Sequence, residues 1–189
     1  MTNTNNKFTA KKLAFAGAAL ALAFALSYVK LFHMPTGGSV TLLSMFFVAI
    51  VGYWYGPFVG LTAAFAYALL QFAQNPSFVT IWSVLFDYIF AFTALGLSGF
   101  FANKKHGLIT GYAVGVFFRF VSTTLASILF WSEYLDMPAW ISDPTLATIV
   151  AAIIYNAGYI FVEALITIVI VLIPPVNNAL KRLKSLANS

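Results

Sequence analysis

The 189-residue sequence contains no cysteine and very little charge. Without cysteine the chain can form no disulfide, no thiolate nucleophile and no cysteine-ligated metal site. Charged residues make up 8% of the chain and hydrophobic residues 61%, whereas an ordinary soluble domain is roughly 25% charged. These figures exclude a water-soluble globule and predict an integral membrane protein of the all-α class.

The sequence also lacks the common motifs of catalysis and ATP use. It has no GxxxxGK[ST] loop, no HExxH and no GxSxG, which hold nucleotide phosphates, zinc and a nucleophilic serine respectively. His33 has no second histidine or acidic cluster at ligand spacing, so no metal site is expected. The sequence therefore shows no recognised catalytic group and no cofactor site, and the chain cannot hydrolyse ATP by itself. If it moves a solute against a gradient, the energy must come from elsewhere.

What the sequence does contain is a series of long apolar runs separated by turn-forming residues. A run of about 20 apolar residues crosses roughly 30 Å of hydrocarbon as a helix, and proline, glycine and asparagine mark the breaks. The sequence predicts one domain of six transmembrane helices, with a loop at 33–39 on one face and a longer segment at 132–145 on the same face. The predicted helices cover 13–32, 40–55, 57–74, 79–102, 107–131 and 146–173.

The basic residues predict how this domain is oriented. The net charge is +5, and most of the basic residues lie in three clusters that flank the apolar runs: Lys7, Lys11 and Lys12; Lys104 and Lys105; Lys181, Arg182 and Lys184. Six crossings place all three clusters on one face, which the positive-inside rule makes cytoplasmic. We predict a multi-pass protein of the cell membrane with a cytoplasmic N-terminus (1–12), a basic cytoplasmic tail (174–189) and no nucleic-acid partner.

Three ionisable residues lie well inside the predicted helices: Asp87, Arg119 and Glu163. A charge at the bilayer centre costs about 2.5–3.5 kcal/mol on insertion scales, so such residues normally face the bundle interior and find partners there. A structural ion pair and a polar ligand site both fit this observation. The sequence leaves open whether Arg119 pairs with Asp87 or with Glu163.

Polar and aromatic residues recur at helical spacing beside these charges. The two stripes are Arg119, Thr123, Ser127 and Trp131 on the fifth helix, and Tyr155, Asn156, Tyr159 and Glu163 on the sixth. With the predicted orientation, Asp87, Trp131, Tyr155 and Asn156 fall in the outer half of the membrane. The pattern predicts an outward-facing pocket for a flat, cationic or amide-bearing heterocycle, with Asp87 as counter-ion or acceptor, although a tryptophan at this depth is also typical of an interfacial anchor.

Two further features each admit two interpretations. Residues Met34, Pro35, Gly37 and Gly38 give the 33–39 loop a fixed entry and unusual backbone freedom, which suits a lid or an ordinary connection. Small residues four apart let membrane helices approach closely. The alanines of the first helix, among them Ala14, Ala18, Ala21 and Ala25, therefore suit either internal packing or docking on a separate membrane protein.

Taken in order, these motifs resemble the substrate-binding S-components of energy-coupling factor (ECF) vitamin transporters, and among them the thiamine transporter group. The resemblance covers almost the whole chain. It rests on the alanine-spaced first helix and on segments 34–42, 66–72, 86–88, 95–97, 130–131 and 155–157.

The resemblance implies a six-helix S-component that binds its vitamin near the outer face beneath the 33–39 loop. It implies docking through the alanine helix on a transmembrane coupling subunit with two cytoplasmic ATPases, and toppling in the membrane to release the vitamin. Carried over residue by residue, it implies an acidic ligand contact at Asp87 beside Tyr88, a stacking aromatic at Trp131 and a hydrogen-bond partner at Asn156. The further ligand-binding positions expected are Arg119, Tyr67, Thr123 and Tyr155.

Two departures from the group favour an alternative ligand. The group commonly has a histidine where this chain has Thr123, and a tyrosine where it has Ala151. A site without that imidazole and that aromatic wall suits another ring, so pyridoxine or pyridoxal is the alternative to thiamine. Thiamine is the first choice because the acidic, tryptophan and asparagine positions are intact.

Two other classes of protein are weighed against an S-component. A stand-alone channel or secondary transporter would need a continuous polar path, whereas the polar stripes crowd one half of the membrane. An intramembrane enzyme would need a nucleophile or a metal set, and the sequence offers neither.

Overall fold

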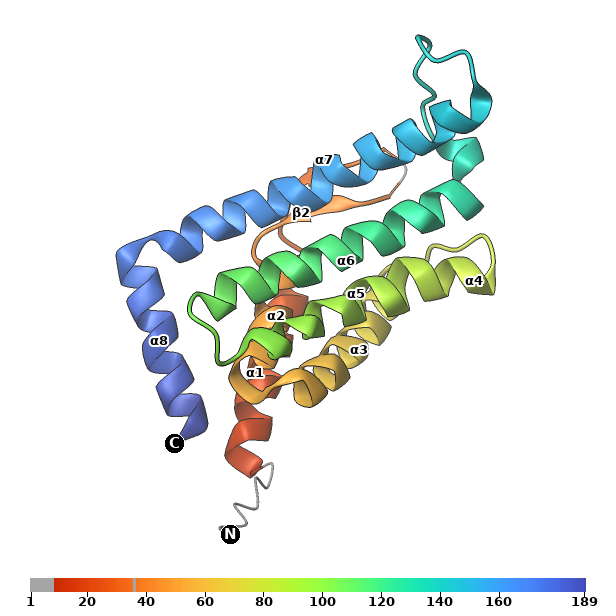
Figure 1. Ribbon diagram of the computed structural model, residues 1–189. Helices are drawn as coiled ribbons and strands as arrows, with labels where there is room; N and C mark the ends of the chain where they lie inside the picture. The colour runs from red at the N-terminus through yellow and green to blue at the C-terminus, as the bar shows by residue number, and fades with distance from the viewer. Residues whose placement is uncertain (1–8, 36) are drawn as a thin grey trace.

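The computed structural model describes residues 9–35 and 37–189, so Lys7 of the N-terminal cluster and Thr36 of the predicted lid lie outside the described residues. The chain forms a bundle of helices with one short hairpin (Figure 1). The elements are α1 (Ala10–Ser27), β1 (Lys30–His33), β2 (Ser39–Thr41), α2 (Ser44–Tyr55), α3 (Pro57–Gln74), α4 (Ile81–Val84), η1 (Leu85–Phe90), α5 (Ala91–Thr93), η2 (Ala94–Phe101), α6 (Gly107–Phe130), η3 (Ser132–Tyr134), α7 (Pro144–Leu172) and α8 (Pro174–Asn188).

Within residues 9–35 and 37–189, five helical segments are long and apolar enough to cross a membrane: 10–27, 57–74, 81–101, 107–130 and 144–172. The segment 81–101 is one rod built from α4, η1, α5 and η2, in which η1 is a π-helical turn and η2 a 3₁₀ helix. The all-helical membrane class is confirmed. The sixth apolar helix, α2, has only 12 residues, which extend about 18 Å, so the described residues do not form six helices of full membrane length.

An antiparallel hairpin replaces the expected helical residues between α1 and α2. The predictions of helix at 28–32 and at 40–43 are wrong, because β1 pairs with β2 from Lys30 opposite Thr41 to His33 opposite Ser39. The Ser27 hydroxyl donates to the Phe24 carbonyl at the end of α1, which satisfies one of the free carbonyls of that terminus. The hairpin and the 12-residue α2 together form the stretch of chain between α1 and α3.

The bundle packs most closely where α2, α3 and η2 meet. A side-chain Cβ at Gly60 would lie 2.5 Å from the Gly52 Cα, and one at Gly96 would lie 2.5 Å from the Gly60 carbonyl carbon. Glycine at these crossings allows backbone to touch backbone, which is a common way for membrane helices to associate.

The alanines of α1 divide between two faces. Ala16, Ala19 and Ala23 are buried against the bundle. The predicted docking residues Ala14, Ala18, Ala21 and Ala25 are all exposed on the other side. Internal packing therefore does not account for these four residues.

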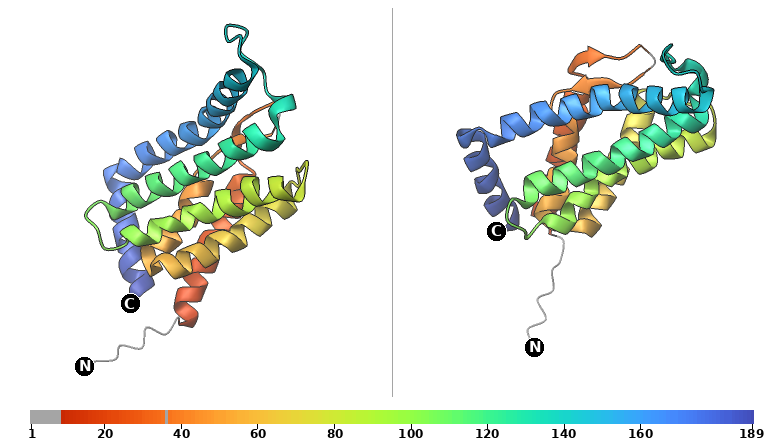
Figure 2. Two further views of the ribbon diagram at one scale, coloured as in Figure 1. Left: turned by 45° about the vertical axis from the view of Figure 1, so that its right-hand side comes forward. Right: turned by 45° about the horizontal axis from the view of Figure 1, so that its top comes forward.

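The two ends of the bundle differ in structure. At one end, here called the termini end, α1 begins and α8 finishes, and the Lys11 Nζ donates to the Ser189 hydroxyl over 2.9 Å (Figures 1 and 2). The predicted tail at 174–189 forms the helix α8 at this end. At the other end, here called the pocket end, lie the 75–80 loop and the 131–143 segment, in which Asp143 accepts from the Leu146 N–H as the N-cap of α7. Which end faces the cytoplasm stays a prediction.

Candidate ligand-binding site

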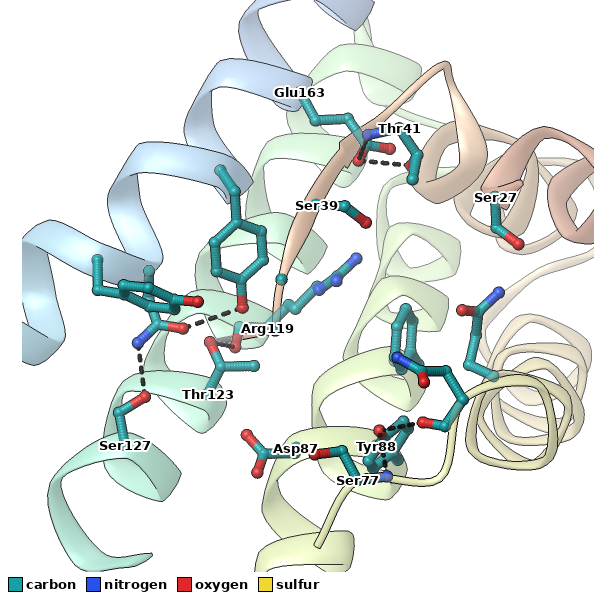
Figure 3. A pocket seen from close by; sticks show the side chains of 18 of the residues that line it. Ser27, Ser39, Thr41, Ser77, Asp87, Tyr88, Arg119, Thr123, Ser127 and Glu163 are labelled. Atoms are coloured by element: carbon teal, nitrogen blue, oxygen red, sulfur yellow. Dashed lines mark hydrogen bonds between the residues drawn. The ribbon is translucent and has the colours of Figure 1, made fainter. Parts of the chain in front are cut away.

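A cavity of about 180 Å³ lies towards the pocket end, between the hairpin, α3, η1, α6 and α7 (Figure 3). Its wall includes seven of the eight residues that the sequence analysis places in the ligand site: Asp87, Tyr88, Arg119, Thr123, Trp131, Tyr155 and Asn156. Five separate segments of the chain therefore converge on one polar and aromatic space.

Asp87 enters the cavity from the π-helical turn η1. The Trp131 Nε1 donates to its carboxylate over 2.7 Å, and the Ser122 hydroxyl of α6 donates to the adjacent Phe86 carbonyl over 2.7 Å. Single π turns widen a helix locally and are frequent at functional sites. The turn and its two contacts with the α6 side of the bundle fix the position of this half-buried carboxylate.

Asn156 occupies the centre of a hydrogen-bonded network. Its Nδ2 donates to the Ser127 hydroxyl over 2.8 Å and to the Ala152 carbonyl over 2.9 Å, and its Oδ1 accepts from the Tyr159 hydroxyl over 3.0 Å. Asn156 is only 2% exposed. Its side chain therefore orients Ser127 and Tyr159, both of which line the cavity.

Aromatic rings form much of the remaining wall. The Tyr88 hydroxyl donates to the Asn75 carbonyl over 2.7 Å and accepts from the Ser77 N–H over 3.2 Å, so it also holds the 75–80 loop. Tyr155 meets Tyr159 edge-on, with their ring centroids 6.1 Å apart. These rings offer flat apolar faces beside the Asp87 carboxylate.

The two other intramembrane charges have separate partners. The Arg119 guanidinium lies 4.2 Å from the centroid of the Phe92 ring, and its Nε is buried without a hydrogen-bond partner in the described part of the chain. The Glu163 carboxylate accepts from the Thr41 N–H and hydroxyl over 3.0 and 2.7 Å, from the Ser44 hydroxyl over 3.1 Å and from the Met45 N–H over 3.3 Å. Glu163 thus ties β2 and the start of α2 to α7, where a carboxylate also suits the positive end of the α2 dipole.

The tip of the hairpin covers part of the cavity. Gly37 and Gly38 line it, whereas Met34 and Pro35 do not. The Met34 N–H donates to the Gly38 carbonyl over 3.0 Å. Gly38 has φ +35°, and a Cβ at this position would lie 2.8 Å from the Tyr159 ring. Only glycine lets the chain approach α7 this closely.

Tyr67 does not line the cavity, although the sequence analysis places it among the ligand-binding residues. It is fully buried, and its hydroxyl donates to the Ala23 carbonyl of α1 over 3.3 Å. The Gln71 Nε2 donates to the Tyr67 oxygen over 2.7 Å. Tyr67 therefore acts indirectly: it does not line the cavity, but it positions Gln71, which does.

Comparison with known proteins identifies the family to which a chain with this fold and cavity belongs. The family described as Thiamine transporter protein (Thia_YuaJ) matches residues 13–183. The chain belongs to the thiamine transporter family. It is 30% identical over 147 residues to the thiamine transporter ThiT of Bacillus subtilis, a match that covers 67% of this chain and 69% of that protein. The solved structure of ThiT from Listeria monocytogenes has the same fold, with a TM-score of 0.66, 22% identity and coverage of 93% of this chain and 96% of the other.

Family membership confirms three of the sequence predictions. The chain is a multi-pass membrane protein, it is a vitamin-binding transporter rather than an enzyme, and the resemblance to the thiamine transporter group is correct. The assignment of individual ligand-binding residues stays a prediction, which the cavity geometry makes specific.

Several residues that line the cavity were not predicted from the sequence as ligand-binding residues. They share short or amide side chains, and they come mostly from α1, the hairpin and the end of α3: Ser27, Ser39, Thr41, Ser44, Gln71 and Gln74. One signal was available, because Gln71 and Gln74 are the two amides of an otherwise mostly apolar predicted helix, and polar side chains inside a membrane usually face the bundle interior. The hairpin residues gave no such signal, because the segment from 40 onwards reads as helix.

Proposed function

We propose that this protein is the substrate-binding S-component of an ECF-type transporter and that its cavity takes thiamine. The observation that carries the proposal is the half-buried Asp87 carboxylate, which faces a cavity walled by aromatic rings and accepts from a neutral indole N–H. Because that donor carries no charge, the carboxylate stays available to a cationic ligand. Thiamine has a quaternary thiazolium and a flat aminopyrimidine, which suit a carboxylate and aromatic faces.

Each predicted site residue then has a role in the proposal. Asp87 is the counter-ion or acceptor for the ligand, and Tyr88, Trp131 and Tyr155 supply faces for stacking. Asn156 contributes through the hydroxyls it orients, and the hairpin tip at Met34, Pro35, Gly37 and Gly38 acts as the lid. Arg119 lies against Phe92, so the ligand competes with no guanidinium for Asp87.

Pyridoxine or pyridoxal is the alternative ligand within the same proposal. Of the two departures that suggest it, Thr123 lines the cavity, where its hydroxyl donates to the Arg119 carbonyl over 3.2 Å. Ala151 is buried and is not part of the cavity wall. Thiamine is the first ligand of the proposal because the acidic, tryptophan and asparagine positions are intact and line the cavity at Asp87, Trp131 and Asn156.

The coupling to partner subunits is the second part of the proposal. We infer six crossings, with α2 and the hairpin as the second, and a cytoplasmic termini end, because the clusters at Lys11, Lys104 and Lys181 gather there. The exposed stripe of Ala14, Ala18, Ala21 and Ala25 would dock on a transmembrane coupling subunit, with two cytoplasmic ATPases supplying energy. Toppling of the domain would then release the vitamin inside the cell.

Calorimetric titration of the purified protein tests the ligand. We expect thiamine to bind with 1:1 stoichiometry, and pyridoxine and pyridoxal to give little heat. Heat with pyridoxine and none with thiamine would replace the ligand and keep the transporter class. Uptake of thiamine into vesicles that contain this chain alone, without ATPase partners, would overturn the S-component proposal in favour of a stand-alone transporter.

A further inference from the structure

Helix α8 leaves the bundle at the point where a membrane-length helix ends. Ile173 has extended backbone angles (φ −60°, ψ 123°) between α7 and α8, and Pro174 and Pro175 open the new helix. Proline at the first helical position cannot continue the preceding helix but starts a new one well. Figure 1 shows α8 turning steeply away from α7 and crossing the termini end of the bundle.

One stripe of α8 packs on the protein. Ala187 is buried, and its carbonyl accepts from the Tyr55 hydroxyl over 3.3 Å. The Lys184 Nζ donates to the Ala102 carbonyl over 2.7 Å and lies 3.6 Å from the centroid of the Tyr53 ring. These contacts, made at the ends of α2 and η2, fix α8 against the bundle.

A second stripe is apolar and faces away from the protein. Ala179, Leu183 and Leu186 follow one another at steps of four and three, which places them on one side of a helix. Leu183 is 39% exposed and Leu186 54%. Leu172 and Ile173, at the end of α7, are exposed as well, so exposed apolar side chains occur on both helices that meet at this turn.

The third stripe is polar and positively charged. It contains Lys181, Arg182 and Ser185, all exposed. Lys11, Lys12, Lys104 and Lys105 lie at the same end of the bundle, whereas the five acidic residues of the chain are Asp87 and Glu163 in the cavity wall and Glu133, Asp136 and Asp143 at the pocket end. The basic side chains at the termini end therefore have no acidic side chain beside them among the described residues.

We propose that α8 lies in the membrane–water interface and binds anionic phospholipids, with Leu183 and Leu186 among the acyl chains and Lys181 and Arg182 on the headgroup phosphates. A helix with an apolar stripe beside a basic stripe is typical of interfacial helices, and anionic headgroups attract basic residues next to a membrane span. The lipid surface is the partner that these observations favour, because exposed apolar side chains lie on α8 and at the adjoining end of α7, and the charged side chains at this end are all basic.

The absence of cysteine makes a direct test possible, since one introduced thiol can be labelled alone. Leu186→Cys and Ser185→Cys are neighbours on the apolar and basic stripes and form a matched pair. Each is labelled with an environment-sensitive fluorophore in the full-length protein, reconstituted into vesicles of phosphatidylcholine with phosphatidylglycerol. We expect spin-labelled lipid to quench the label at 186 at least about threefold more than the label at 185, and aqueous iodide to show the reverse order.

A charge experiment tests the anionic part of the proposal. Lys181→Gln with Arg182→Gln removes two charges from α8, and Lys104→Gln with Lys105→Gln removes two from the neighbouring loop. We expect only the α8 pair to abolish the increase in lipid quenching at 186 that phosphatidylglycerol produces over pure phosphatidylcholine. The proposal is overturned if lipid quenches the labels at 185 and 186 equally, or if both charge pairs cause the same loss. If the label at 186 is protected only when another protein is added, the apolar stripe belongs to an interface with that protein instead. Thiamine titration of the same samples tests the ligand proposed for the cavity. A failure of the proposed function is therefore distinguishable from a failure of the lipid proposal at α8.

Discussion

The indole Nε1 of Trp131 donates a hydrogen bond of 2.7 Å to the carboxylate of Asp87 and so ties the residue that follows α6 to the π-helical turn η1. The two side chains are 44 positions apart in the chain. In the proposed function one supplies charge and the other an aromatic face, and the bond between them fixes their relative orientation before any ligand enters. Such preorganisation reduces the ordering that a ligand must impose when it binds.

Replacing Asp87 with asparagine tests the counter-ion role. Asn keeps an acceptor for Trp131 but removes the charge, so we expect thiamine affinity to fall by more than tenfold, at least about 1.4 kcal/mol. Calorimetric titration measures the change. Asp136→Asn, in the exposed segment near α7, is the matched control and should leave affinity unaltered. Unchanged affinity in a folded Asp87→Asn protein would remove this residue from the site.

Tryptophan fluorescence reports on the other member of the pair. We expect thiamine to quench the emission of the native protein, because Trp131 lines the cavity. Trp131→Phe should lose most of this quenching and bind thiamine more weakly, since phenylalanine has no N–H for Asp87. Trp140, 75% exposed, provides the control, and Trp140→Phe should retain the signal. Retained quenching in Trp131→Phe would place the ligand elsewhere.

The close approach of the hairpin tip to α7 predicts a steric effect at Gly38. An added Cβ would meet the Tyr159 ring at 2.8 Å, and φ of +35° is unfavourable for other residues. We expect Gly38→Ala to weaken thiamine binding by about tenfold, since such strain costs of order 1–3 kcal/mol. A Cβ at Gly17 on α1 would meet nothing within 4 Å, so Gly17→Ala should bind normally. Equal affinities for the two variants would mean that the tip is not part of the binding state.

The bonds around Glu163 predict an effect on stability. Glutamine offers one acceptor oxygen and an NH₂ group to a set of donors on Thr41, Ser44 and Met45, so some donors lose their partner. Hydrogen bonds to a charged group are worth about 1.5–3 kcal/mol each. We expect Glu163→Gln to lower the thermal unfolding temperature in detergent clearly, while Glu133→Gln at an exposed position leaves it unchanged. An unaltered midpoint would show that these bonds do not hold the hairpin to α7.

The exposed alanine stripe predicts a separation of uptake from binding. A tryptophan at Ala18 or Ala21 would project from α1 away from the bundle, so thiamine binding should persist while ATP-driven uptake in cells that hold the partner subunits is lost. Leu13→Trp, exposed on the same helix outside the stripe, should keep both. Loss of binding in Ala18→Trp or Ala21→Trp would mean that this face is needed for folding instead.

The sequence by itself determined the membrane class, most of the helices and seven of the residues that line the cavity. These properties are local: apolar length marks a spanning helix, and polar residues at steps of three or four mark one face. The stripe from Arg119 to Trp131 and the group around Asn156 could therefore be found without knowing how the helices pack. The cation clusters were equally visible, because they depend only on their distance along the chain from the apolar runs.

The tertiary structure alone decided which groups bond to one another. Asp87 meets Trp131 rather than a guanidinium, and Glu163 meets Thr41, which is 122 positions away. Partners at such separations depend on the packing of several helices, which no local pattern encodes. The same reason explains the hairpin: its residues are apolar enough for a helix, but the backbone at 39–45 bonds to β1 and to Glu163, partners that are distant in the sequence. Tyr67 is the opposite case: its residue type suits a ligand-binding role, but helix packing buries it outside the lining of the cavity.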